Sequence, residues 1–256
     1  MRFWLAWQFL TIIPVPRRYQ SSGIDNLGAS TAFFPMIGLI LGLLLLGLDW
    51  SLGLVFPSII VNTMLIIALL VVTGALHFDG FVDTCDGLVV KGCTAEKLRL
   101  MEDTQVGAFG VAGGCCLLLA KFAALYALPH ELRATILLLL PVLSRWVMVF
   151  VIYAFPAAKR EGLGWSAKRG TDGKGIAVAS IFAIVVAAIL LKWWGAVLLG
   201  LVCLILGAVS HCLCSRFGGL TGDNYGAINE LSEVVVPVLA HMIGTLGAKN
   251  WLVSMW

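Results

Sequence analysis

Three aspartates in one short segment, Asp79, Asp83 and Asp86, are the residues of this sequence best suited to carry out chemistry. Their spacing of four and then three residues places them within about 60° of one another on one face of a helix. Three carboxylates this close repel one another unless a cation neutralises them. Oxygen ligands of this kind suit a hard ion, so the motif predicts a Mg²⁺ site in which Mn²⁺ can substitute. A solvated polar helix end is the alternative, but no Lys or Arg is interleaved among the three acids.

Further acidic residues extend this predicted site. Asp103 stands just before an apolar stretch, where it is either another metal ligand or a plain helix cap. Asp223 follows the glycine-containing turn 218–222, whose backbone N–H groups are suited to an anion, and it shares a helix face with Glu230. We therefore predict metal ligation by Asp79, Asp83, Asp86, Asp103 and Asp223, and catalytic roles for Asp83, Asp86 and Glu230, with Asp86 and Glu230 as the candidates for the general base.

Basic and polar residues add a predicted substrate site. Arg145 lies inside an apolar stretch, where an Arg marks a functional or paired position, so we expect it to neutralise a phosphate or an Asp. His77 is interpreted chiefly as a structural or supporting group, with substrate contact as the alternative. The predicted substrate-binding residues are His77, Arg145, Thr221, Gly222 and Asn224. Carboxylates for a metal, glycine turns for phosphate and a few cations together predict phosphoryl transfer.

The elements that position these residues are predicted to be membrane helices. Apolar residues make up 60% of the 256 residues and charged residues only 12%, about half the usual share, so lipid must be part of the solvent. The segment 1–13 is too short to span and is predicted to be a retained interfacial helix. The seven cysteines show no zinc spacing and are interpreted as buried apolar residues rather than disulfides. The predicted spans are 31–50, 57–78, 106–128, 133–155, 175–192, 193–213 and 233–248. The fold class is therefore an all-α polytopic bundle of about seven transmembrane helices, forming one domain over residues 1–256.

The predicted loops place the chemistry on one side of the membrane. With these spans, the segments 1–30, 79–105, 156–174 and 214–232 share one side, and most of the 17 Lys and Arg residues lie in them. The positive-inside rule then predicts that this side faces the cytoplasm. Nearly all of the 14 acidic residues lie on or at the edge of the same side. The positive-inside rule concerns Lys and Arg and does not explain this clustering of acids. Lys159 and Arg160 are explained equally well by topology or by phosphate binding. No basic run with interleaved aromatic residues suggests a nucleic acid as partner.

At these residues the chain resembles the cobalamin synthases, also called adenosylcobinamide-GDP ribazoletransferases. The resemblance covers nearly the whole chain. Its motifs are Phe9-Leu10-Thr11 to Pro14-Val15-Pro16, Phe34-Pro35-x-Ile37-Gly38, His77-x-Asp79-x3-Asp83-x2-Asp86, Gly107-Ala108-Phe109-Gly110, Ser144-Arg145, Glu161-Gly162-Leu163-Gly164 and Thr221-Gly222-Asp223-x2-Gly226-Ala227. One departure is Gln105, where the family commonly has an Arg, and this weakens the expectation of a charged substrate contact there.

The resemblance implies a reaction and a location. Adenosylcobinamide-GDP and α-ribazole, or α-ribazole 5′-phosphate, would give adenosylcobalamin, or its 5′-phosphate, and GMP in the last steps of vitamin B12 biosynthesis. It further implies dependence on Mg²⁺ and a place in the bacterial inner membrane. The sequence leaves open a homo-oligomer or a complex with other enzymes of the corrinoid pathway.

Two other classes of protein compete with this interpretation. A CDP-alcohol phosphatidyltransferase also uses helical acids and a metal, but its Ala-Arg after the second position and its Gly-x3-Asp-x3-Asp continuation are absent from this sequence. A transporter or proton relay would place acids near the middle of the bilayer. The acids predicted here stand at helix ends on one side, which favours an enzyme at the interface.

Overall fold

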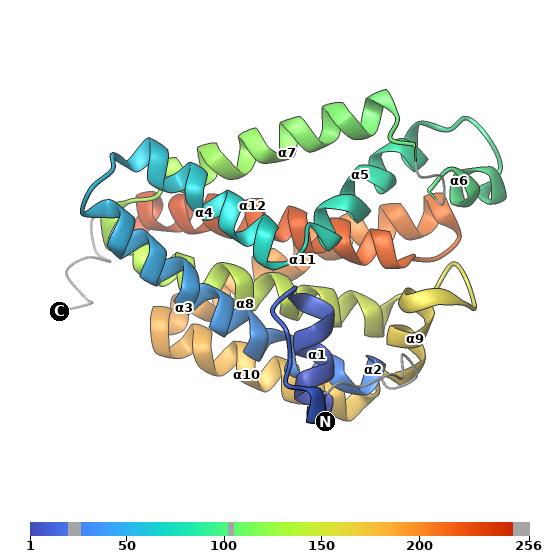
Figure 1. Ribbon diagram of the computed structural model, residues 1–256, viewed down its shortest axis with the longest axis horizontal. Coiled ribbons are helices and arrows are strands. Elements are labelled where there is room, and N and C mark those ends of the chain that lie inside the picture. The colour runs from blue at the N-terminus through green and yellow to red at the C-terminus, as the bar shows by residue number, and fades with distance from the viewer. Residues whose placement is uncertain (20–26, 102–104, 248–256) are drawn as a thin grey trace.

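The protein is all-helical in the computed structural model, which describes residues 1–19, 27–101 and 105–247 (Figure 1). Within these residues no strand is present, and only an isolated bridge joins Ala157 to Leu220. The predicted all-α class is therefore confirmed. The elements are α1 (Arg2–Leu10), η1 (Arg17–Tyr19), α2 (Leu27–Ser30), η3 (Thr31–Phe33), α3 (Phe34–Gly53), α4 (Ser58–Val72), α5 (Leu76–Val89), α6 (Thr94–Leu100), α7 (Ala108–Tyr126), α8 (His130–Ala154), α9 (Gly162–Gly170), α10 (Gly173–Leu191), α11 (Trp193–Phe217) and α12 (Gly222–Gly247).

The long helices confirm a multi-pass membrane protein. Six segments of the described chain are long and apolar enough to cross a bilayer, and α4 with α5 makes a seventh if this bent pair is one broken span. The six segments are Leu27–Gly53, Ala108–Tyr126, His130–Ala154, Gly173–Leu191, Trp193–Phe217 and Gly222–Thr245. Helix α8 is the most buried of them and packs along α3 and α12, so it forms the centre of the bundle.

Glycines let the central helices approach one another closely, as the spacing of Gly38 and Gly42 predicts. A Cβ atom on Gly38 would collide with the backbone oxygen of Pro141, and one on Gly42 would lie 2.7 Å from that of Leu138. Helix α3 therefore packs directly on the backbone of α8. A Cβ atom on Gly47, further along α3, would have no other atom within 4 Å. Only the part of α3 around Gly38 and Gly42 therefore requires glycine for contact.

The predicted span 57–78 is wrong in one important respect, because the helix breaks inside it. Gly74 and Ala75 both adopt left-handed backbone conformations, with φ of 61° and 53°. Helix α5 consequently leaves α4 at an angle of 91°. The acidic motif therefore lies on a helix, as its spacing predicts, but this helix is separate from the preceding span and sharply bent away from it.

The predicted segments 156–174 and 214–232 also differ from the structure, since both contain helix. The first holds α9, and the second is divided between α11, which runs to Phe217, and α12, which begins at Gly222. Glu230 consequently lies inside a candidate membrane span rather than in a loop. The connections between helices still group at two ends of the bundle as predicted. The connections α5–α6 and α8–α9 lie at one end, and the connections α3–α4 and α7–α8 lie at the other (Figure 1).

The cysteines correct another expectation. All seven are free, so none forms a disulfide, but Cys115, Cys116 and Cys212 are exposed rather than buried. They lie on membrane-spanning helices, where the surrounding solvent is hydrocarbon and a small apolar side chain needs no protein cover.

Candidate active site

The acidic motif on α5 lies directly against the start of α12. A Cβ on Gly80 would lie 2.8 Å from Asp223 Cα, and one on Gly226 would lie 3.1 Å from His77 Cα. These two glycines allow the backbones of α5 and α12 to touch. The contact brings Asp79 and Asp83 of one helix close to Asp223 of the other, and we call these three residues the acidic face.

Asp83 lies at the centre of the acidic face. It is half-buried and interacts electrostatically with Asp79, Asp223 and, less strongly, Asp86. Asp79 is exposed, and within the described chain neither Asp79 nor Asp83 forms an ion pair. The predicted gathering of carboxylates is therefore present, with Asp223 as its third member.

The described residues alone do not form a complete metal-binding site. Among the described residues, no group of three or more His, Cys, Asp or Glu side chains converges closely enough to hold an ion. Asp103, the predicted additional ligand, lies outside the described residues. Ligand atoms beyond those of the acidic face would have to come from substrate and water.

Asp86 is turned away from this group toward α7. Its Oδ2 accepts a hydrogen bond from the backbone N–H of Gly107 and its Oδ1 accepts one from Gly110, each at 2.7 Å. These N–H groups belong to the first turn of α7 and have no partner within that helix. A Cβ at Gly107 or Gly110 would collide with the Asp86 carboxylate, which explains the glycines of this segment. Asp86 thus fastens α7 to α5.

A polar cleft adjoins the acidic face where α9 and α12 begin. Its lining includes Lys159, Glu161, Thr221, Gly222 and Asp223, and its volume is about 460 Å³. The first turns of α9 and α12 are in backbone contact, because a Cβ on Gly164 of α9 would lie 2.6 Å from the backbone nitrogen of Gly222. Two helix N-termini that meet at one cleft favour a bound anion.

Backbone pairing holds Lys159 beside this cleft. Ala158 N–H donates to Leu220 O at 3.0 Å, and Leu220 N–H donates to Pro156 O at 2.8 Å. The loop after α8 is therefore joined to the turn between α11 and α12. Lys159 attracts Asp223 electrostatically and lines the same cleft. Membrane topology alone could explain this lysine in the sequence, but in the structure it lies at the site.

The first two glycines of the turn before α12 have structural roles. Gly218 ends α11 with a left-handed φ of 70°, and Gly219, with φ of 148°, contacts the backbone of Ala157 and Ala158. Asn224 is fully buried: its Oδ1 accepts from Thr221 N–H at 3.0 Å and its Nδ2 donates to Thr84 Oγ1 at 3.0 Å. Of the predicted substrate residues in this segment, Thr221 and Gly222 line the cleft, whereas Asn224 holds the turn on α5.

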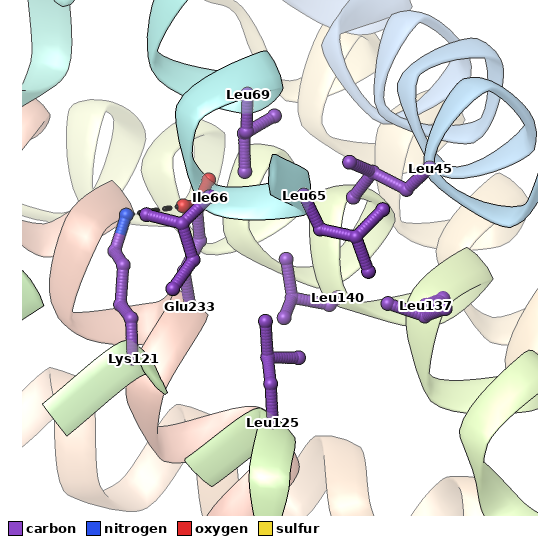
Figure 2. Close-up of a pocket in the computed structure, with 9 residues that line it drawn as sticks. All are labelled: Leu45, Leu65, Ile66, Leu69, Lys121, Leu125, Leu137, Leu140 and Glu233. Atoms are coloured by element: carbon purple, nitrogen blue, oxygen red, sulfur yellow. Dashed lines mark hydrogen bonds and ion pairs between the residues drawn. The ribbon is translucent and has the colours of Figure 1, made fainter. Parts of the chain in front are cut away.

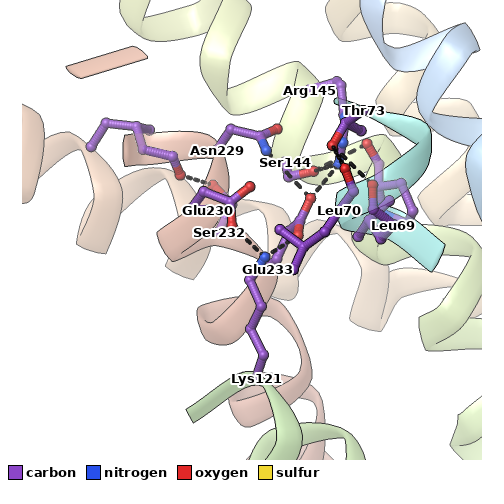
Figure 3. Close-up of polar contacts among 12 residues, drawn as sticks. Leu69, Leu70, Thr73, Lys121, Ser144, Arg145, Asn229, Glu230, Ser232 and Glu233 are labelled. Carbon is purple, nitrogen blue, oxygen red and sulfur yellow. Dashed lines mark hydrogen bonds and ion pairs between the residues drawn. The ribbon is translucent and has the colours of Figure 1, made fainter. Parts of the chain in front are cut away.

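Arg145 and Glu230 belong to a different group, a buried ion network between α7, α8 and α12 (Figure 3). Lys121 Nζ lies 2.5 Å from Glu230 Oε2 and 2.6 Å from Glu233 Oε2, and Arg145 Nη1 lies 2.5 Å from Glu233 Oε1. All four side chains are almost completely buried. Two cations and two carboxylates make the network neutral overall, which is the arrangement that buried charges require.

The surroundings of the ion network are apolar. Figure 2 shows Lys121 and Glu233 among the residues that line a small cavity of about 20 Å³, whose other lining residues are Leu and Ile. Arg145 Nε and Nη2 and Asn229 Oδ1 have no hydrogen-bond partner within the described chain. The expectation that acids stand only at helix ends is therefore wrong for Glu230 and Glu233.

Lys121 and Glu233 belong to the ion network, although no motif in the sequence singles them out. The available signal was an ionisable residue inside each of three apolar helices, since such residues pair with one another.

Comparisons with known proteins agree with the resemblance in the sequence motifs. The model of the family described as "Cobalamin-5-phosphate synthase" matches residues 2–241. A protein of Geotalea daltonii named adenosylcobinamide-GDP ribazoletransferase is 37% identical over 247 residues, which cover 94% of this chain and 97% of that protein. Proteins of the same name from Desulforamulus reducens and Roseiflexus sp. are 32% and 34% identical, covering 91% and 90% of this chain and 92% and 85% of their own lengths. No solved structure matches the chain.

Proposed function

The chain belongs to the cobalamin-5-phosphate synthase family, and from this membership we propose that it joins adenosylcobinamide-GDP to α-ribazole or its 5′-phosphate and releases GMP. It is a membrane-embedded transferase of cobalamin synthesis. The observation that carries the finer proposal is the contact of the acidic face with a cleft formed by two helix N-termini and Lys159. Such a cleft suits a diphosphate, because it offers both N–H groups and a cation.

The proposed step is a displacement at phosphorus. A ribose hydroxyl of the acceptor attacks the phosphorus nearer the cobinamide, a new P–O bond forms, and the bond to the oxygen that bridges to GMP breaks. An acceptor with a 5′-phosphate still has to present a hydroxyl, so the attacking group is one of the other ribose hydroxyls. We propose that its proton passes to a carboxylate of the acidic face. Asp86 and Glu230, the earlier candidates for this role, already accept bonds from Gly107, Gly110 and Lys121.

We propose Mg²⁺ as the cofactor, held by one or two of the carboxylates of Asp79, Asp83 and Asp223 together with substrate phosphate and water. The donor set fits, because these are oxygen-only ligands with no cation of the described chain paired to Asp79 or Asp83. Mg²⁺ usually takes one or two carboxylates, substrate phosphates and waters, so three converging protein ligands are not needed. When bound, the ion would neutralise charge on the diphosphate and the leaving GMP.

The metal proposal predicts that turnover depends on a divalent cation. Purified protein in detergent is incubated with adenosylcobinamide-GDP and α-ribazole, and released GMP is measured by chromatography. After treatment with EDTA we expect the rate to fall by at least about a hundredfold, since several kcal/mol of charge stabilisation are lost. Addition of Mg²⁺ or Mn²⁺ should restore it. An undiminished rate in EDTA would exclude the proposed cofactor, and no GMP under any condition would exclude the proposed function.

We also propose that the protein lies in the bacterial cytoplasmic membrane with the acidic face toward the cytoplasm, because most Lys and Arg residues lie at this end. Cys93 offers a direct test, since it is exposed at the same end, just before α6. A membrane-impermeant maleimide should label Cys93 in inverted vesicles and leave it unlabelled in intact spheroplasts. The Cys93→Ser variant is the control for labelling at other sites, and labelling in spheroplasts would reverse the proposed orientation.

A further inference from the structure

A second cavity lies behind the polar cleft and differs from it in character. It has a volume of about 90 Å³, and most of its lining is apolar: Phe9, Leu76, Met148, Ile152, Leu163 and Ala167. It shares Leu163, Gly164, Gly222 and Asp223 with the polar cleft. The two spaces therefore adjoin at Asp223, and we call the apolar one the inner cavity.

His77 supplies a polar group at the inner cavity. It lines the cavity, is only 2% exposed, and neither of its ring nitrogens has a hydrogen-bond partner within the described chain. A buried polar group without a partner is costly, and such groups in proteins usually find one. Tyr225 also lines the cavity, and its buried hydroxyl has no hydrogen-bond partner within the described chain either. A ligand that brings one or two hydrogen-bonding atoms into this largely apolar space would fit both features of the cavity.

We propose that the inner cavity binds the heteroaromatic base of the acceptor nucleoside while the polar cleft holds the diphosphate. This assignment rests on the proposed function. The base of α-ribazole is a flat, largely apolar bicyclic ring, which suits a mainly apolar cavity that offers a polar group. The corrin ring is far too large for this cavity. Guanine carries several donors and acceptors that apolar walls would leave unpaired. A ribose attached to a base in the inner cavity would extend past Asp223 toward the cleft.

The test fills the cavity with a larger side chain. Ala167 is buried and lines the inner cavity, so Ala167→Leu should exclude the ring. We expect the KM for α-ribazole to rise at least tenfold while the KM for adenosylcobinamide-GDP changes less than twofold. Ala177→Leu is the matched control, because it adds the same side chain at an exposed position on α10. Leu76→Trp, at a partly exposed residue that lines the inner cavity and not the polar cleft, is a second variant should Ala167→Leu not fold.

A truncated acceptor separates loss of the base from loss of folding. Methyl riboside offers the ribose hydroxyls without a base, and the wild type should prefer α-ribazole over it by about a hundredfold in kcat/KM, because ring burial favours the complete acceptor. The filled variants should lose this preference and keep the rate with methyl riboside. Equal losses with both acceptors would overturn the proposal.

Direct binding decides the matter independently of turnover. Equilibrium dialysis with benzimidazole as the probe should detect binding to wild type and to Ala177→Leu, and at least tenfold weaker binding to Ala167→Leu. α-Ribazole should displace the probe. Displacement by a short-chain phospholipid and not by α-ribazole would mean that a lipid occupies the cavity, and the proposal would then be wrong. If the wild type bound benzimidazole but released no GMP, the proposed function would be wrong, whereas the binding of a heteroaromatic ring in the inner cavity would stand.

Discussion

Asp83→Asn should lower kcat/KM for GMP release by about 10³-fold, equivalent to about 4 kcal/mol of transition-state stabilisation. Asp83 is the central carboxylate of the acidic face, with Asp79 and Asp223 as its electrostatic neighbours. The amide keeps the size of the side chain and removes its charge, so a bound cation loses a ligand and the attacking hydroxyl loses an acceptor. Kinetics with purified protein at saturating Mg²⁺ measure the effect.

Glu96→Gln is the control for the Asp83 variant. Glu96 is an exposed carboxylate on α6, at the same end of the bundle, and it serves only the start of its own helix by accepting from Cys93 N–H at 3.0 Å. We expect its rate to stay within about twofold of wild type, because surface substitutions of this kind have small effects. Asp83 makes no hydrogen bond or ion pair in the described structure, so its variant should also melt at the wild-type temperature. Full activity of Asp83→Asn would remove the acidic face from the mechanism.

The spans were predictable because their signal is local. A stretch of about 20 apolar residues is sufficient to indicate a membrane helix, and the predicted span 133–155 differs from α8 by only a few residues. The part of the acidic face that lies on α5 was predictable for a similar reason. The spacing of Asp79 and Asp83 fixes their relation on one helix, but their contact with Asp223 depends on Gly80 and Gly226, whose roles become visible only when α5 meets α12.

The break between α4 and α5 was not predictable from local sequence. The residues around it are apolar and read as a continuation of the span. In the structure, Ile12 N–H donates to Val72 O at 2.8 Å, so the chain after α1 supplies a partner to the end of α4. A segment some 60 residues away in sequence thus satisfies a carbonyl that a helix end leaves free. Asp86 shows the same limit. Its spacing predicts a place in the acidic face, but its carboxylate instead accepts hydrogen bonds from two backbone N–H groups of α7.

Lys121→Met is expected to destabilise the protein by about 3–5 kcal/mol, the typical effect of removing one partner from a buried ion pair. Lys121 is paired with both Glu230 and Glu233, and its loss leaves two buried carboxylates with Arg145 alone. Met preserves most of the volume of Lys, so packing changes little. For a chain of this size the melting temperature in detergent should fall by roughly 6–20 °C.

The double variant Lys121→Met/Glu230→Met tests charge balance against catalysis. It removes one cation and one carboxylate and leaves the Arg145–Glu233 pair intact, so most of the lost stability should return, since paired removal of buried charges is often nearly neutral. If Glu230 only completes the network, the double variant should also turn over at a rate close to wild type. A stable double variant without activity would instead show that Lys121 or Glu230 takes part in turnover. Stability that stays as low as in Lys121→Met would show that the network holds the helices by specific hydrogen bonds rather than by neutrality, and that Glu230 is needed for α7 to dock on α12.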